Sequence, residues 1–404
     1  MAETAHGKIK VYASFPHLIA SGTNPSFDPS NWHWVHCLTF PMERLNELQF
    51  SPRPYKWIRY AIGVVVGAHG DLSSSSNRLN IVDYNASLPT ESQSISLYYH
   101  TSDDERQIMF PIDPNIGCTN VTSSTATTRR AQFCSDVAMR DGKQCVFTGL
   151  QELFCDAVHL LGHSKGDSLC YTYSFLYIST YTQHRSRDPA GDDIVQDIDD
   201  VRNGLFLNKM THVGVDNNSI AFLPTPNFAM DTSDINPAAP KEEKRCTIHL
   251  FEPSEPMFLG GTGEVHSNSP IRISDTPDWP PAILFDAVYA STVLHHFGTQ
   301  TLKDVVTATW MDAFDPGCVM TDTRPIARDR MQKLEQKRQT CHEARINSRV
   351  VPDTFDMLMA LLYILVPPDE LQATLREVEE KAKTAEQRRV QEKVDTWKRQ
   401  VISP

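Results

Sequence analysis

One stretch of this chain, CVFTGLQELFCDAVHLLGHSKGD at 145–167, constrains its fold more than any other. Two short apolar runs stand on either side of Thr148-Gly149, and apolar runs bounded by turn residues are typical of buried strands. The stretch therefore predicts a strand, a turn and a second strand from about 153 to 161. The second run contains His159, and a polar turn follows it. Because a buried strand has no need of an imidazole at its exit, we expect chemistry at this point.

Two residues farther along the chain complete a pattern with His159. Asn203 opens the segment NGLFL, and His212 follows in a stretch that reads as a helix. A histidine at a strand end, then Asn-Gly, then a helical histidine is the order of a ββα-metal site. Each piece alone has a simpler explanation, since Asn203-Gly204 could be only a turn and His159 only a core or surface histidine. The prediction depends on the three residues together, and we expect His159 and His212 to converge on one pocket.

Taken together, these residues resemble the HNH nuclease family, and they are most similar to a branch found in uncharacterised fungal proteins. The resemblance covers about 129–235 and implies a ββα-metal fold, a divalent ion (Mg²⁺, Mn²⁺ or Zn²⁺) and hydrolysis of phosphodiester bonds in nucleic acid, DNA rather than RNA. It is carried by the pattern C-x-x-T-G, A-x-H, N-G-L-x-L and H, which stands here as Cys145/Thr148/Gly149, Ala157-Val158-His159, Asn203-Gly204-Leu205-Phe206-Leu207 and His212.

The chemistry of phosphodiester hydrolysis suits these residue types. His159 would be the general base that activates water, because imidazole titrates near neutral pH. Asn203 would orient that imidazole without adding charge, and His212 would hold the divalent ion, which acts as a Lewis acid. Three basic residues near this segment would contact nucleic-acid phosphates: Arg202, Lys209 and Lys165.

One position departs from the family pattern. Many members carry a carboxylate or a second imidazole directly before the first histidine, whereas this chain has Val158 there. We predict Asp156 as the second metal ligand, although on a strand it lies about 7 Å from the usual ligand position. A hydrogen-bonded strand residue is the alternative role for Asp156. Two further candidate ligands follow the strand: His163 and Asp167.

The net charge of the chain restricts the kind of partner it can bind. The chain has a net charge of -12, which excludes a generic polyanion binder, so any nucleic-acid site must be local. The acidic balance and Val158 favour an alternative function, a catalytically inactive HNH-fold module that binds nucleic acid or protein. A third alternative is a scaffold in which the N-terminal part and the C-terminal tail do the work.

The rest of the chain predicts an α+β protein. Residues 1–115 are expected to form a β-rich sandwich or barrel, because short β-branched and aromatic runs, including WIRYAIGVVVGAHG from Trp57, alternate with turn residues. The HNH-like domain would take 129–236, followed by a helical region at 275–366. A charged helical tail at 367–404 would pack on its own domain or mediate self-association.

An aromatic segment at 168–183, SLCYTYSFLYISTYTQ, interrupts the HNH-like pattern. Either a hydrophobic hairpin or sequence translated from a retained intron would explain it. Because the pattern around it is already complete, we expect this segment to protrude from the module.

The cellular setting follows from cysteine usage and from the absence of targeting signals. Nine cysteines, an odd number without a C-x-x-C, indicate reduced thiols rather than a disulfide framework. The start of the chain lacks the features of a signal peptide, and the apolar run from Met357 is too short to span a bilayer. We expect an intracellular protein, cytoplasmic or nuclear, that is not secreted and does not bind membranes.

Overall fold

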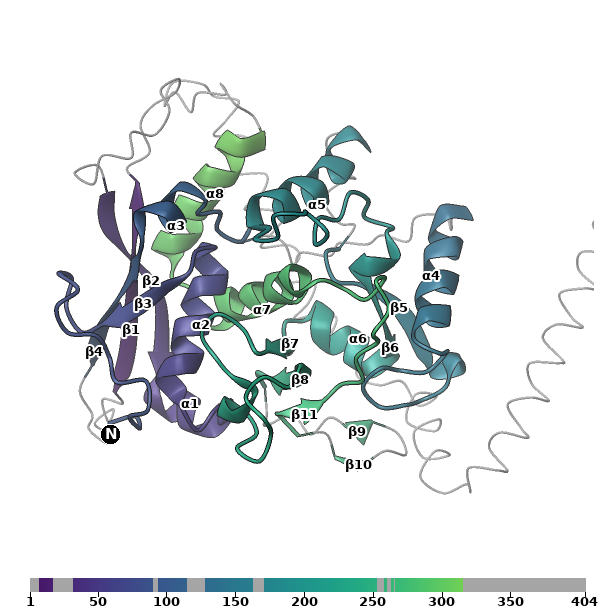
Figure 1. Cartoon of the computed structure of the whole chain (residues 1–404), viewed down its shortest axis with the longest axis horizontal. Coiled ribbons are helices and arrows are strands. Elements are labelled where there is room, and N and C mark those ends of the chain that lie inside the picture. Colours follow the sequence, from purple (N-terminus) through teal and green to yellow (C-terminus); the bar gives the residue numbers. More distant parts are fainter. Residues whose placement is uncertain are drawn as a thin grey trace, which may run out of the picture. The chain divides into compact units, whose positions relative to one another are not determined.

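The computed structural model describes residues 7–16, 32–89, 94–114, 128–162, 171–252, 258–259, 263–264 and 266–314, all of which belong to the compact unit Met1–Met320. Sheets and helices are mixed along the chain, as the predicted α+β class requires (Figure 1). The predicted tail at 367–404 and the part of the helical region after 314 lie outside the described residues.

In chain order the helices and strands are β1 (Lys8–Pro16), β2 (Trp32–Pro41), α1 (Met42–Leu48), α2 (Pro54–Val66), β3 (Gly70–Ser73), β4 (Ile95–Thr101), α3 (Asp103–Gln107), α4 (Thr128–Arg140), η2 (Glu152–Phe154), β5 (Cys155–His159), α5 (Tyr171–Arg185), η3 (Val201–Asn203), β6 (Gly204–Asn208), α6 (Lys209–Asp216), β7 (Ile220–Thr225), η4 (Thr232–Asp234), β8 (Arg245–Leu250), β9 (Phe258–Leu259), β10 (Gly263–Glu264), β11 (Ser269–Pro270), α7 (Ala282–Phe297) and α8 (Gln300–Phe314). No helix among them is long and apolar enough to cross a membrane.

The N-terminal part contains a sheet, as predicted, but among the described residues it is one four-stranded sheet backed by helices and not a sandwich or barrel. Its four strands have the order β2-β1-β4-β3, with β1 antiparallel to β2 and parallel to β4. Alternation along β1 buries Ile9, Val11 and Ala13 on one face. Helices α2 and α7 cover that face, since Phe40 of β2 packs against Trp57 at 5.4 Å and against Phe297 at 4.7 Å. The helices therefore complete the core that the sheet begins.

The predicted strand beginning at Trp57 is wrong. Residues Pro54–Val66 form helix α2, which starts with Pro54 in its first turn and ends at Gly67, a left-handed residue with φ of 78°. Most of the helix is buried, so only Lys56 and Arg59 mark its polar side, which is a weak signal of helical periodicity. Its Val and Ile residues suit strands by local preference, and burial between the sheet and α7 overrides that preference.

The strand-turn-strand unit predicted at 145–161 has only its second strand in the structure. Strand β5 is present and ends at His159, but its partner is β6, in antiparallel register from Cys155↔Asn208 to His159↔Gly204. The segment before β5 forms a turn with one isolated bridge, Gln144↔Gln151, instead of a strand. The turn forms because Gly149 takes a left-handed φ of 71° and its N–H donates to Cys145 O. Helices α4 and α6 both contact the β5–β6 pair, and a second sheet of order β11-β8-β7 follows.

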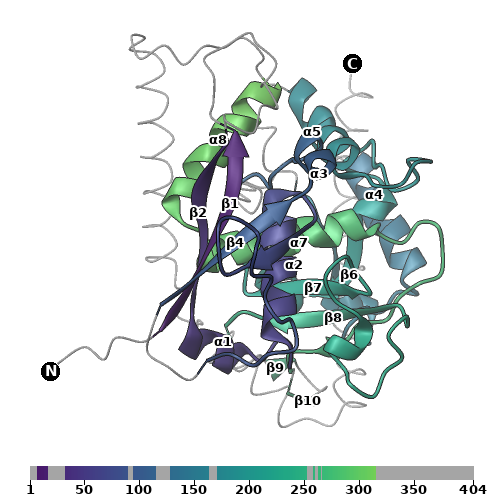
Figure 2. The same cartoon turned by 60° about the vertical axis from the view of Figure 1, so that its left-hand side comes forward.

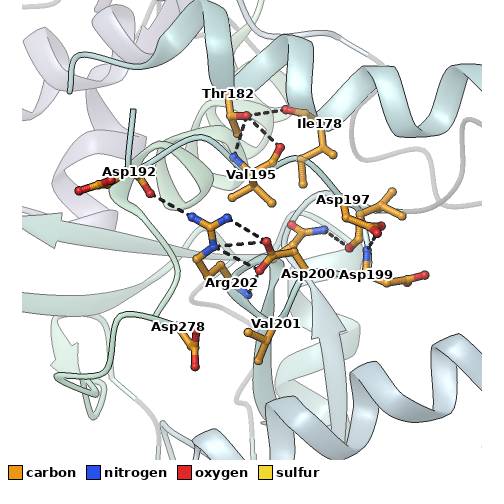
Figure 3. Close-up of polar contacts among 12 residues, drawn as sticks. Ile178, Thr182, Asp192, Val195, Asp197, Asp199, Asp200, Val201, Arg202 and Asp278 are labelled. Atoms are coloured by element: carbon orange, nitrogen blue, oxygen red, sulfur yellow. Dashed lines mark hydrogen bonds and ion pairs between the residues drawn. The ribbon is translucent and has the colours of Figure 1, made fainter. Parts of the chain in front are cut away.

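The aromatic segment at 168–183 is neither a hairpin nor a protrusion where it is described. Residues Tyr171–Arg185 form helix α5, and its second half is buried through Ile178, Tyr181 and Thr182. Figure 3 shows the Thr182 hydroxyl between Ile178 O and the N–H of Val195. Contacts with distant segments thus make this helix part of the core, which the local sequence could not indicate.

Candidate functional site

His159 ends β5, as predicted, and lies between an aromatic ring and a carboxylate. Its imidazole stacks on Phe133 of α4, with ring centroids 3.9 Å apart and planes 5° from parallel. Its Nε2 lies 3.2 Å from Oδ1 of Asp199. The side chains of His159 and Asp199 are 13% and 10% exposed, so both are shielded but reachable by solvent.

The residue opposite His159 makes room for this stacking. Gly204 pairs with His159 across the two strands. A Cβ at Gly204 would lie 2.7 Å from Phe133 and 2.7 Å from Val137, closer than side chains normally approach. A glycine is therefore required here, because only a residue without a side chain lets α4 reach the strand pair.

Asn203 does not contact the imidazole in the manner predicted. It is fully buried, and its Nδ2 donates to Leu161 O at 3.0 Å and to Ile198 O at 2.8 Å. Its Oδ1 accepts from the N–H of Leu161 at 2.9 Å, and its main-chain carbonyl accepts from Leu160 at 2.8 Å. The amide thus fixes the backbone directly after His159 and orients the strand end instead of the ring.

His212 lies on α6 between two carboxylates. Its Nδ1 is 3.7 Å from Asp156, the predicted second ligand, and its Nε2 is 3.3 Å from Asp216, one helical turn along. The hydrogen bond to Asp216 and the charge of both carboxylates raise the pKa of His212, against the effect of burial. The structure therefore brings Asp156 and His212 together and adds Asp216 to them.

The structure does not bring His159 and His212 into one cluster. Residues three positions apart on a strand face opposite sides, so Asp156 and His159 leave β5 in opposite directions. Their contacts agree, because His159 stacks on α4 whereas Asp156 meets His212 on α6. Helix α6 also begins after Asn208, the end of β6 that lies away from His159.

The cluster of Asp156, His212 and Asp216 fits some divalent ions better than others. An imidazole gives one nitrogen to a metal, and its other nitrogen commonly donates to an orienting carboxylate. The cluster therefore offers one imidazole and one carboxylate as direct ligands, and no group of three or more His, Cys, Asp or Glu able to hold a metal occurs in the part of the chain that the structure describes. Two ligands suit Mg²⁺ or Mn²⁺, which keep several waters, better than Zn²⁺, which takes three or four protein ligands. The other candidate ligands, His163 and Asp167, lie outside the described residues.

The basic residues predicted to contact phosphate differ in whether their charge is already paired. Arg202 is paired with Asp200 at 2.9 Å and donates to Asp192 O at 3.0 Å (Figure 3), and the hydrogen bond to Asp200 raises its pKa. Its charge is therefore already matched. Lys209 is exposed in the first turn of α6, three positions before His212, whereas Lys165 lies outside the described residues.

Three contacting residues did not emerge from the sequence pattern: Asp199, Asp216 and Phe133. Asp216 could have been found, because it follows His212 by four positions on a predicted helix. Asp199 is 40 positions from His159, and only the folded loop brings them together. Phe133 similarly reaches His159 only because α4 packs on the strand pair.

Comparison with protein families gives a match over this same segment. Residues 145–223 match the family model described as HNH endonuclease. Searches of curated proteins and of solved structures found no match. The matched segment contains His159, Asn203 and His212, which supports the resemblance to the HNH family seen in the sequence.

Proposed function

We propose that the segment 145–223 is a metal-dependent endonuclease of the HNH type, from the branch with A-x-H at the strand end, and that it hydrolyses phosphodiester bonds of nucleic acid. One observation carries the proposal: His159 stands at a strand end with Nε2 3.2 Å from Asp199 and its following backbone held by Asn203. An imidazole fixed in this way is suited to accept a proton from water at neutral pH.

The contact with Asp199 decides which nitrogen would act. An ionised carboxylate only accepts hydrogen bonds, so the neutral imidazole carries its proton on Nε2, facing Asp199. Nδ1 then bears the lone pair and would take the proton of the attacking water. Asp199 would stabilise the imidazolium that results, as a buried carboxylate does beside a catalytic histidine.

His212 and Asp156 would hold the ion, with Asp216 orienting His212. A divalent ion bound there would supply Lewis-acid stabilisation of the charge on phosphate and leaving group. The nuclease proposal requires this ion and His159, which lie on opposite faces of β5, to reach the same phosphate. Lys209 would add a phosphate contact beside this pair. Reduced thiols such as those of Cys145 and Cys155 are compatible with action inside the cell, in the cytoplasm or nucleus.

Cleavage of plasmid and of single-stranded DNA with Mg²⁺ or Mn²⁺, abolished by EDTA, is the expected result. His159→Ala should abolish cleavage, because it removes the base, and it should leave metal affinity unchanged when titrated by calorimetry. His212→Ala should weaken metal affinity and cleavage together. Asp156→Ala should also weaken metal affinity if Asp156 is a ligand, whereas a purely structural Asp156 would alter only the free energy of unfolding.

The alternative function is an HNH-fold module that binds nucleic acid or protein without cutting. Three observations favour it: the placement of His159 and His212 on opposite faces of β5, the two-ligand set and the matched charge of Arg202. Nucleic-acid binding without cleavage across Mg²⁺, Mn²⁺, Ni²⁺ and Zn²⁺ would establish this alternative and refute the nuclease.

A further inference from the structure

The outward face of the N-terminal sheet carries a row of aromatic side chains. Alternation turns Tyr12 of β1, Trp34 and His36 of β2 and Tyr98 of β4 away from the buried face. All four side chains are half-buried, in contrast to the fully buried residues between them along each strand. We call these four residues the aromatic row.

Within the aromatic row the rings stack in two different ways. Tyr12 lies parallel to His36 at 5.0 Å and to Tyr98 at 5.3 Å, as cross-strand neighbours do. Trp34 meets Tyr98 at 5.1 Å and His100 at 5.0 Å, edge to face in both cases. Because these partners are on β4 and Trp34 is on β2, the indole must extend across β1 over Ser14, its small cross-strand neighbour. Trp34 therefore reaches from β2 across β1 to the side chains of β4.

The helices leave this face of the sheet largely uncovered among the described residues. Phe40 and the other inward side chains pack on α2 and α7, and Figure 2 shows the sheet in front of these helices. At the margin, His100 bonds to Ser75 O at 3.0 Å and Arg106 lies 5.1 Å over the Trp32 ring. The aromatic row thus forms the centre of a shallow surface.

Positive charge stands at both ends of the aromatic row. Lys8 and Lys10 share the outward face of β1, and Arg106 stacks on Trp32 at the opposite end. Asp71 on this face is paired with Arg59 at 3.0 Å and with Arg78 at 4.0 Å, and Arg106 is paired with Asp103 at 3.3 Å. Although the chain as a whole is acidic, with a net charge of -12, this face combines ring surfaces with the cations of Lys8 and Lys10.

We propose that the aromatic row binds single-stranded nucleic acid, with a base stacked on Trp34 and phosphates near Lys8 and Lys10. The proposal rests on the nuclease function above and names its substrate class. Aromatic rings accept any base by its flat face, and flanking cations follow the backbone without reading sequence. A duplex hides its base faces, so the surface should prefer single strands.

Fluorescence anisotropy of a labelled ten-nucleotide dT strand, in EDTA so that nothing is cut, tests the proposal. Trp34→Ala should weaken binding by about fivefold or more, since stacking of a base on an aromatic ring contributes at least that much. Trp34→Phe should restore most of the affinity. Lys10→Gln should weaken binding and lower the slope of log Kd against log salt by about 0.7. Lys241→Gln, an exposed lysine outside this face, is the matched control and should change neither.

Two comparisons separate this proposal from the nuclease. His159→Ala should keep full affinity for the dT strand. Cleavage by the wild-type protein together with unchanged binding by folded Trp34→Ala and Lys10→Gln proteins would refute the aromatic row and leave the nuclease standing. If the dT strand bound in a manner that depends on Trp34 and the wild-type protein cut nothing, the nuclease would be refuted and the aromatic row would stand. Equal affinity for a ten-base-pair duplex would also refute the proposal. So would a failure to bind either the dT strand or an RNA strand of ten uridines, and that result would indicate a protein partner for this surface.

Discussion

The Asp199 carboxylate is the contact that distinguishes His159 from an ordinary histidine at a strand end. Its Oδ1 lies 3.2 Å from Nε2, and the main-chain N–H of Asp199 donates to Asp197 Oδ1 at 3.0 Å, which fixes the backbone at this position (Figure 3). If His159 is the base, Asp199 is its positioning residue. Asp199→Ala should lower kcat by about tenfold or more, a part of the roughly 10²–10⁴-fold that a general base contributes.

The same substitution should leave KM nearly unchanged, since Asp199 does not touch substrate in this role. Asp199→Asn should lose less activity, because the amide oxygen still accepts the Nε2 proton. Asp192→Asn, an exposed aspartate of the same loop, is the control. Steady-state kinetics on folded proteins would count against the role if Asp199→Ala changed KM and left kcat intact.

At the scale of elements, the pairing of β5 with β6 depends on the buried amide of Asn203. This amide makes three hydrogen bonds to the main chain of Leu161 and Ile198. Asn203→Ala would leave those buried groups unsatisfied, at a cost of about 2–4 kcal/mol in the free energy of unfolding. Urea unfolding measures this cost, and the exposed Asn85→Ala should stay within about 0.5 kcal/mol of wild type. An equally stable Asn203→Ala protein with reduced cleavage would instead support direct orientation of the imidazole.

Helix α4 approaches the same strand pair so closely that Gly204 controls the position of Phe133. A methyl group at Gly204 would press on Phe133 and Val137 at 2.7 Å. Gly204→Ala should therefore destabilise the protein by about 1–3 kcal/mol through overpacking. It should also reduce cleavage by displacing the ring that stacks on His159. Gly142→Ala is the control for backbone strain. Its φ is 69°, but a Cβ at this position would meet nothing within 4 Å, so the substitution strains the backbone without crowding a neighbour. If both variants lost equal activity, crowding at Phe133 would not be the cause.

At the scale of the whole molecule, His249 joins the second sheet to the helices of the first. It is buried, stacks on Phe50 at 4.2 Å and lies 2.6 Å from the Tyr289 hydroxyl through Nδ1. Burial lowers its pKa to about 3. Between pH 6.5 and about 3 the unfolded chain therefore binds a proton at His249 that the folded protein does not.

This difference should lower stability as the pH falls below 6.5, by up to about 1.4 kcal/mol per pH unit. His249→Gln should show a shallower decline in the free energy of unfolding between pH 7 and 5. Burial also lowers the pKa of His69, to about 4, so His69 makes stability fall with pH in the same direction. Because His69 is present in the wild type and in His249→Gln, it does not affect the difference between them. Parallel stability curves for wild type and His249→Gln would contradict the assignment.

Residue order and local periodicity were enough to predict several parts of this protein. They placed His159 at a strand end and His212 on a helix, and they indicated strands within residues 1–115 and helices after residue 275. These predictions hold because each depends on neighbours within a few positions, where the repeats of strand and helix and the chemistry of turns act directly.

Tertiary structure alone decided the rest. Helix α2 reads as a strand because it is buried on most sides, and α5 is stable through contacts with distant loops. Asn203 holds the backbone of Leu161 and not the imidazole, and Asp199 reaches His159 across 40 positions. The separation of His159 from His212 follows from which face of β5 each helix covers. Each of these outcomes depends on which segments far apart in the chain pack together, and that is set by burial of the whole apolar surface, which no local pattern encodes.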